Sequence, residues 1–191
     1  MQRMNYQEYE INRKYNMDEF EQEGERKEVG CFIYGLPDCY KIYKTMYKSK
    51  IKHNTWSIMK IEIYKDNEPY IEFYRNYPSI SIAFAEQNSK EFIITSEDYQ
   101  CITIINLTDK VIKTYTDVDD IQMGCGFCPV DIDWDEYTLY IEGCIWGCPY
   151  ETMICRDIDL QNPIDAFNNA EWDTEYDDDI YTDPDDEEDE D

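Results

Sequence analysis

The chain has 191 residues, of which 42% are hydrophobic, and this is enough for one domain with a packed core. Its formal net charge of −27 is uneven, because residues 1–113 carry 18 acidic and 16 basic side chains while residues 114–191 carry 26 acidic side chains and one basic one, Arg156. This field repels nucleic acids and anionic membranes, so we expect neither as a partner and expect a protein partner, possibly a basic one.

Residues 1–28 form a polar N-terminal segment with few aliphatic side chains. The composition favours either a short helix carrying Tyr6, Tyr9 and Arg13 or a disordered stretch. The segment lacks the apolar region of a signal peptide, and no later run approaches the roughly 18 apolar residues of a membrane span. We therefore expect a cytoplasmic protein (in the host cytoplasm or the virion if it is viral) whose eight cysteines start out reduced.

The β-domain is expected over residues 29–160. A first strand is predicted at Val29–Leu36, and it ends at a Pro-Asp turn signal. Residues 38–53 are ambiguous between helix and strand. Within them, the basic stretch Lys41–His53 is interleaved with aromatic residues, and we expect it to complement the acidic end of the chain rather than to bind RNA.

From Trp56 onward, apolar residues alternate with polar ones, and turn signals recur every 8–12 residues. This pattern predicts an all-β antiparallel meander of short hairpins, best defined over 56–159, for which a partial propeller-like arrangement, a barrel and a sandwich all remain open. The predicted strands before the central stretch cover residues 56–64, 70–74, 80–85, 91–95, 100–106 and 111–115, and a further strand is expected at 152–160.

The central stretch, residues 124–151, predicts one β-hairpin. Val130 and Ile132 alternate with acidic residues before a polar turn at 134–137, and Leu139 and Ile141 alternate after it. The apolar residues are therefore expected to share one face of the hairpin.

The register of this hairpin determines where its cysteines point. With Asp133 opposite Thr138, Cys128 lies beside Gly143 and continues the apolar face, whereas Cys144 points the other way. This register gathers all four cysteines of the stretch near one end of the hairpin.

The cysteines Cys125, Cys128, Cys144 and Cys148 are candidate zinc ligands, because their spacing resembles the two knuckles of a zinc ribbon. The second pair is one residue wider than in that template, and Trp146 next to it has the character of a packing residue. The alternatives are a disulfide and buried thiols that act as small hydrophobic groups, and we favour the buried thiols.

No catalytic arrangement stands out. His53 is the single histidine, and it lies in a lysine-rich segment. Glu142 and Glu151 could act as an acid–base pair, although acidic residues are so abundant that one pairing carries little information. The acidic run 131–136 spaces its carboxylates as a calcium-binding loop does, but it lacks the glycine at the sixth position of such a loop and the glutamate at its end.

Residues 161–191 are expected to form an acidic disordered tail, since apolar periodicity stops at Gln161. The last 21 residues hold 14 acidic side chains, and like charges at this density do not pack.

Four segments carry a resemblance to a known family: Arg75–Ser79 (RNYPS), Thr95–Gln100 (TSEDYQ), Gly126–Cys128 (GFC) and Gly143–Glu151 (GCIWGCPYE). Over about residues 60–159, the chain resembles an uncharacterised family of small β-rich proteins of bacteria and giant DNA viruses. The resemblance implies a β-rich fold and transfers no catalytic residue, because the family has no established activity. Its cysteines correspond to Cys128, Cys144 and Cys148, and the position of Cys125 is usually not cysteine.

These observations favour a non-catalytic, intracellular β-domain that acts as a protein-interaction or structural module. One alternative is a small hydrolase-like enzyme that uses carboxylates beside the loop of Trp146. Another is a zinc-stabilised structural protein, for example a virion component.

Overall fold

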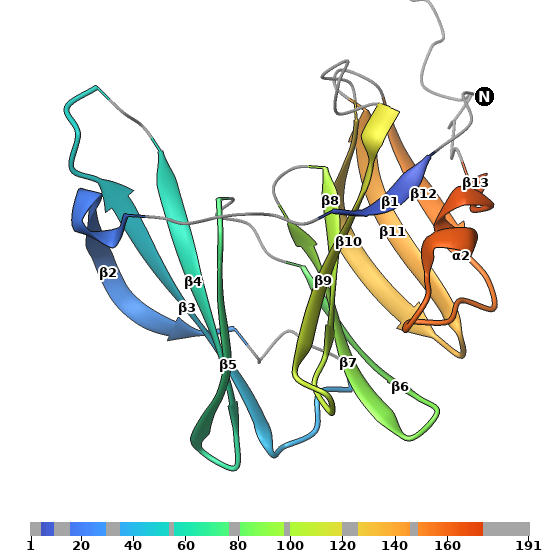
Figure 1. Ribbon diagram of the computed structural model, residues 1–191, viewed down its shortest axis with the longest axis horizontal. Helices are drawn as coiled ribbons and strands as arrows, with labels where there is room; N and C mark the ends of the chain where they lie inside the picture. The colour runs from blue at the N-terminus through green and yellow to red at the C-terminus, as the bar shows by residue number, and fades with distance from the viewer. Residues whose placement is uncertain are drawn as a thin grey trace, which may run out of the picture.

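The computed structural model describes residues 5–9, 16–29, 35–53, 56–76, 81–97, 100–119, 126–145 and 149–173. These residues form an all-β fold of three antiparallel sheets, which confirms the predicted fold class (Figure 1). No long helix occurs in the described parts of residues 81–159.

Each sheet is built mainly from strands that follow one another in sequence. Sheet A has the order β1–β9–β8–β7–β6, sheet B has β2–β3–β4–β5, and sheet C has β10–β11–β12–β13. The strands are β1 (Tyr6–Tyr9), β2 (Phe20–Glu28), β3 (Tyr40–Ser49), β4 (Ser57–Lys65), β5 (Glu68–Arg75), β6 (Ile82–Gln87), β7 (Lys90–Glu97), β8 (Cys101–Asn106), β9 (Val111–Asp117), β10 (Phe127–Asp135), β11 (Thr138–Ile145), β12 (Tyr150–Cys155) and β13 (Glu171–Asp173); the short helices are η1 (Met17–Glu19) and α2 (Ile164–Asn168).

Three hairpins close through two-residue turns in which both residues have positive φ. The turns are Asp66-Asn67, Asn88-Ser89 and Glu136-Tyr137. Turns of this hand match the right-handed twist of the flanking strands, and asparagine and aspartate tolerate positive φ better than most residues. The local sequence therefore fixes the pairs β4–β5 and β6–β7 most directly.

Sheet A lies between the other two sheets and is covered on both faces (Figure 1). In β8, every residue from Cys101 to Ile105 is buried, which explains why this strand is apolar except at Thr103, whose hydroxyl is hydrogen-bonded to that of Thr114. Because successive side chains point to opposite faces, Ile102 and Ile104 enter one core and Ile105 enters the other. The molecule is a three-layer β-sandwich.

We name the two cores after the sheets that enclose them. The A/C core joins Ile94 and Ile104 of sheet A to Leu139 and Ile141 of sheet C, and it includes Phe167 of α2. The A/B core joins other residues of sheet A to the inner face of sheet B; its buried members are Tyr40, Ile42, Met59, Ile61, Ile63, Ile93, Ile105 and Leu107.

Both ends of the chain contribute more to the fold than the sequence indicated. Residues 6–9 form strand β1 rather than a helix, and residues 20–28 form the edge strand β2 of sheet B. Residues 161–173, expected in the disordered tail, instead form α2 and β13. Phe167 of α2 is fully buried, so the folded part extends beyond the expected end at residue 160. The expected strand at 29–36 is not formed at Val29, and residues 30–34 lie outside the described part.

The central hairpin forms, but its predicted register is wrong by two residues. Asp135 pairs with Thr138, so the turn holds two residues rather than four. The register then shifts between Pro129 and Asp131 at a β-bulge, which leaves Val130 44% exposed rather than on the core face.

The register and the bulge together correct the predicted surroundings of Cys128. Its partner on β11 is Cys144, not Gly143. Ile132, Leu139 and Ile141 do enter the A/C core, as predicted, but Cys128 is buried outside that cluster.

Candidate functional site

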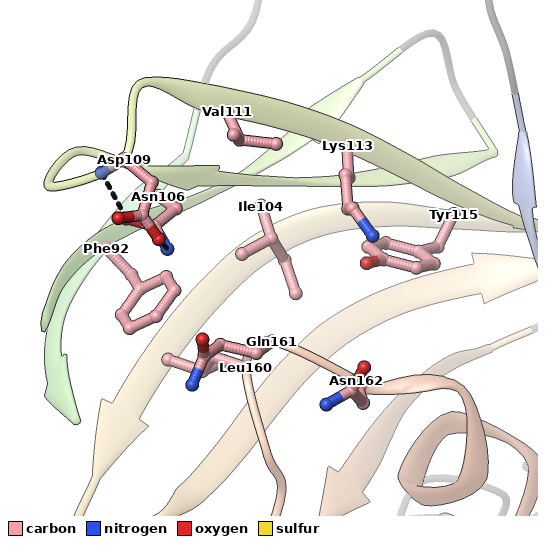
Figure 2. A pocket seen from close by; sticks show the side chains of 10 residues that line it. All are labelled: Phe92, Ile104, Asn106, Asp109, Val111, Lys113, Tyr115, Leu160, Gln161 and Asn162. Carbon is pink, nitrogen blue, oxygen red and sulfur yellow. Dashed lines mark hydrogen bonds between the residues drawn. The ribbon is translucent and has the colours of Figure 1, made fainter. Parts of the chain in front are cut away.

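A cleft with a volume of about 280 Å³ lies between sheet A and the segment that follows β12 (Figure 2). We call it the end cleft. It is lined by Phe92, Ile104, Asn106, Asp109, Val111, Lys113, Tyr115, Leu160, Gln161 and Asn162.

The floor of the end cleft is apolar. Phe92 and Ile104 point from sheet A, and Leu160 points from the opposite wall; all three are at most 3% exposed. Asn106 and Asp109 lie at the end of the cleft near Phe92, and at the other end Lys113 and Tyr115 on β9 face Asn162 across the cleft (Figure 2). This combination of an apolar base and a few polar groups is typical of binding sites for small molecules or single side chains.

The wall that carries Leu160 is held in place by a buried glutamine. Gln87 is 3% exposed; its Nε2 donates to the carbonyl of Ile158 at 2.7 Å, and its Oε1 accepts from the backbone N–H of Leu160 at 2.9 Å. Lys90 Nζ adds a bond to Gln161 Oε1 at 2.9 Å. Since a buried amide is costly to leave unsatisfied, these bonds hold the backbone at Ile158 and Leu160 against sheet A.

The charged groups at the rim are arranged in ion pairs. Lys90 Nζ lies 2.7 Å from Asp109 Oδ2, and Lys113 Nζ lies 2.9 Å from Glu8 Oε2. The ammonium group of Lys90 holds the pKa of Asp109 below its usual value. A further carboxylate, Asp159, accepts bonds from Gln161 and Asn162, so the rim, taken as the lining residues and the charged groups bonded to them, carries three carboxylates and two ammonium groups, of which Asp109 and Lys113 line the cleft itself.

Tyr115 connects the cleft to the A/C core. Its ring is 1% exposed and packs edge-on against Phe167 with the centroids 5.6 Å apart. Burial, together with the carboxylates of Glu8 and Asp159, raises the pKa of Tyr115 to about 12. The hydroxyl is therefore neutral near pH 7 and can donate or accept a hydrogen bond.

The structure describes two of the four predicted zinc ligands. Cys128 and Cys144 are direct partners across β10 and β11, while Cys125 and Cys148 lie outside the described residues. Cys144 alternates with Ile145 of the A/C core, so the pair lies on the outer face of sheet C. Among the residues that the structure describes, no three potential ligands gather at one point.

Gly143 allows β10 and β11 to approach closely beside this pair. A Cβ atom at this position would meet the carbonyl oxygen of Cys128 and would lie 2.6 Å from the Phe127 ring. Only a residue without a side chain fits there.

The suggested acid–base pair is not brought together. Glu142 pairs with Thr152, whereas Glu151 pairs with Gly143, so the two carboxylates lie on opposite faces of sheet C. The acidic run expected to resemble a calcium loop is part of the extended strand β10 and its turn. His53 is exposed in a turn with positive φ.

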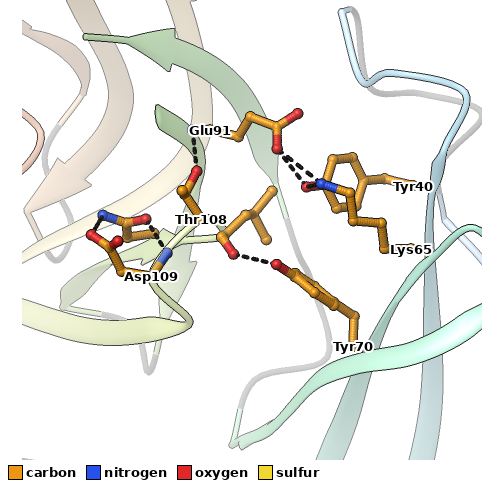
Figure 3. Close-up of polar contacts among 8 residues, drawn as sticks. Tyr40, Lys65, Tyr70, Glu91, Thr108 and Asp109 are labelled. Carbon is orange, nitrogen blue, oxygen red and sulfur yellow. Dashed lines mark hydrogen bonds and ion pairs between the residues drawn. The ribbon is translucent and has the colours of Figure 1, made fainter. Parts of the chain in front are cut away.

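A second polar cluster joins sheets A and B (Figure 3). Tyr40 donates to Glu91 Oε2 at 2.7 Å, and Lys65 Nζ bonds to both the Tyr40 hydroxyl, at 2.7 Å, and Glu91, at 3.2 Å. Nearby, Tyr70 donates to the carbonyl of Leu107 at 2.7 Å. These bonds connect side chains of β3, β4 and β5 to β7 and to Leu107, so they hold sheets A and B together.

Comparison of the chain with protein-family models, curated proteins and solved structures found no match. The helices within the described ranges are too short to traverse a bilayer. The resemblance to the uncharacterised β-rich family stays a prediction.

Sequence reasoning missed the end cleft. Its residues come from β7, from the β8–β9 hairpin and from 160–162, and they are polar, apolar and aromatic residues of ordinary types. No spacing signal links segments this far apart, because the cleft exists only after sheets A and C pack together.

Proposed function

We propose that the protein is a non-catalytic interaction module whose end cleft receives a basic side chain of a protein partner. The observation that carries this proposal is the combination of an apolar floor with acidic side chains in and next to the lining: Asp109 lines the cleft, and Asp159 accepts bonds from Gln161 and Asn162. The aliphatic stem of a lysine or arginine side chain suits the surface of Phe92, Ile104 and Leu160. Its charged end suits the carboxylate of Asp159, whereas the carboxylate of Glu8 is already paired with Lys113.

The pKa shifts of the described residues favour binding over catalysis. General acids and bases need pKa values close to the working pH. Every resolved shift among the described residues moves a pKa away from neutrality: the pKa of the Asp109 carboxyl falls, while the pKa values of Tyr40, Tyr74, Tyr115, Cys128, Cys155, Lys60, Lys65 and Arg156 rise. The hydrolase alternative also receives no support from Glu142 and Glu151, which lie on opposite faces.

The distribution of charge supports a basic partner. The net charge of −27 attracts cationic proteins over distances of about a Debye length, roughly 8 Å at physiological salt. Such attraction accelerates association and weakens as salt is added. The cleft would then select one side chain from the partner that this field attracts.

The test is an equilibrium titration of fluorescently labelled ten-residue peptides that differ at one position: lysine, norleucine or glutamate. We expect the lysine peptide to bind most tightly and to weaken with salt. Val111→Trp should abolish binding by filling the cleft, because Val111 lines it and is 41% exposed.

Ile112→Trp is the matched control. Ile112 is the next residue of β9, is similarly exposed at 39%, and points to the opposite face of sheet A. Equal binding of the three peptides, or equal loss in the two tryptophan variants, would contradict the proposal.

A further inference from the structure

We propose that Cys128 and Cys144 form a reversible disulfide across β10 and β11, which makes the outer face of sheet C a site of thiol oxidation. This site is separate from the end cleft and does not depend on the proposed binding function. The register carries the inference, because each cysteine is the direct partner of the other in the antiparallel pair.

The backbone geometry of such a pair suits a disulfide. Directly opposed residues of antiparallel strands have Cα atoms about 4.5–5.5 Å apart, within the roughly 4.4–6.8 Å that a disulfide spans. Their Cβ atoms are about 4.5–5.5 Å apart, and a disulfide needs about 3.5–4.5 Å. Formation of the disulfide therefore requires the two Cβ atoms to approach each other by about 1 Å.

Two local features make this closure feasible. Gly143, next to Cys144, lets the backbone carbonyl of Cys128 approach β11 without a side chain between the strands. The β-bulge between Pro129 and Asp131 interrupts the regular ladder directly beyond the pair, so the strands can adjust there.

The two thiols differ in access. Cys144 is half-buried, whereas Cys128 is 8% exposed, and its Sγ contacts the carbonyl oxygen of Gly126 at 3.5 Å. Burial, with a smaller contribution from Cys144, raises the pKa of Cys128, so this thiol ionises less readily than a free one. An external oxidant therefore meets Cys144 first.

The reaction with a neutral disulfide reagent, 2-hydroxyethyl disulfide, balances as follows. The Cys144 thiolate attacks the reagent, its S–S bond breaks, and one mercaptoethanol leaves while Cys144 keeps the other in a mixed disulfide. The Cys128 thiolate then attacks the Cys144 sulfur and expels the second mercaptoethanol. The two cysteines lose two electrons to the reagent, and their two protons end on the two mercaptoethanol molecules.

The sequence makes the bridge straightforward to map. Trypsin leaves residues 114–156 in one peptide, because Arg156 is their single basic residue. Chymotrypsin, which cleaves after aromatic residues, separates the cysteines into TDVDDIQMGCGF, CPVDIDW, IEGCIW and GCPY.

The experiment oxidises the reduced full chain with 2-hydroxyethyl disulfide, blocks the remaining thiols with iodoacetamide, and maps the chymotryptic peptides by mass spectrometry. We expect CPVDIDW linked to IEGCIW. A link that includes Cys125 or Cys148, or Cys128 found alkylated while Cys144 carries mercaptoethanol, would overturn the proposal.

Three variants sharpen the result. Cys128→Ser should accumulate the mixed disulfide on Cys144, and Cys144→Ser should leave Cys128 reduced, because its thiol is buried. Cys39→Ser, which changes a partly exposed cysteine of another layer, should leave the bridge unaffected. If a hairpin variant fails to fold, the wild-type peptide map still decides, since it requires no substitution.

Discussion

Removal of residues 171–191 is predicted to destabilise the protein, whereas removal of residues 174–191 is not. The difference is strand β13, which pairs with β12 through three residue pairs. Its Trp172 packs on the A/C core and meets the Phe127 ring edge-on, with centroids 5.0 Å apart. Glu171 also forms an ion pair with Arg156 at 2.9 Å.

The magnitude follows from these contacts. Removing a fully buried aromatic side chain costs about 3–5 kcal/mol, and the half-buried Trp172 should contribute about half of that. The Phe127–Trp172 pair accounts for roughly 0.5–1.5 kcal/mol of that loss, and the exposed ion pair adds between about 0 and 1. We therefore expect a loss of about 2–3 kcal/mol, or a fall in Tm of about 4–12 °C.

The shorter truncation is the matched control, because residues 174–191 hold 12 acidic side chains and their removal changes the net charge from −27 to −15. Relieving this repulsion should leave stability equal or slightly higher. Urea denaturation of both truncations and of Trp172→Ala measures the effect. Equal stability of the two truncations would refute the role assigned to β13.

Three further outcomes are expected. Gly143→Ala should lower the free energy of unfolding by about 1–3 kcal/mol, because the added Cβ forces the carbonyl of Cys128 away. Urea denaturation measures this loss, and an unchanged midpoint would contradict the close approach of the two strands. Gln87→Ala should cost about 1–3 kcal/mol and weaken peptide binding in the end cleft, since it releases the wall at Leu160; retained affinity would show that the glutamine does not set the cleft width. Burial raises the pKa values of Tyr40 and Tyr115 to about 12, against about 10 in an unfolded chain. Between about pH 10 and 12 the folded state therefore binds more protons than the unfolded state, and the free energy of unfolding should fall as the pH rises. Urea midpoints across this range should fall less steeply in Tyr115→Phe, and an identical slope would refute the assignment.

The strands of the middle and C-terminal part could be predicted because each buries one or both faces. The alternation of Ile82 with Ala83 and Phe84, and the largely apolar composition of β8, are direct consequences of the packing of sheet A against both of its neighbours. The strand β2 was missed for the opposite reason. All but one of its residues are exposed, so its pairing with β3 left no apolar periodicity in the sequence.

The hairpin register could not be predicted because two local devices leave weak sequence signals. The turn uses Glu136 and Tyr137, both with positive φ, instead of the asparagine and glycine that usually mark such turns. The bulge at Val130 then inserts one residue, and a one-residue insertion moves every later side chain to the other face. Cys128 was consequently placed on the wrong face.

The central claim, that the end cleft receives a basic side chain, is tested most directly by mapping the contact in solution. The measurement is an amide NMR titration of the full chain with a blocked Gly-Lys-Gly peptide, with Gly-norleucine-Gly as the reference. We expect the lysine peptide to shift the signals of Asn106, Asp109 and Asn162 around the cleft, and the norleucine peptide to shift them less. Shifts centred on the outer face of sheet C or sheet B, or the same shifts with both peptides, would contradict the claim.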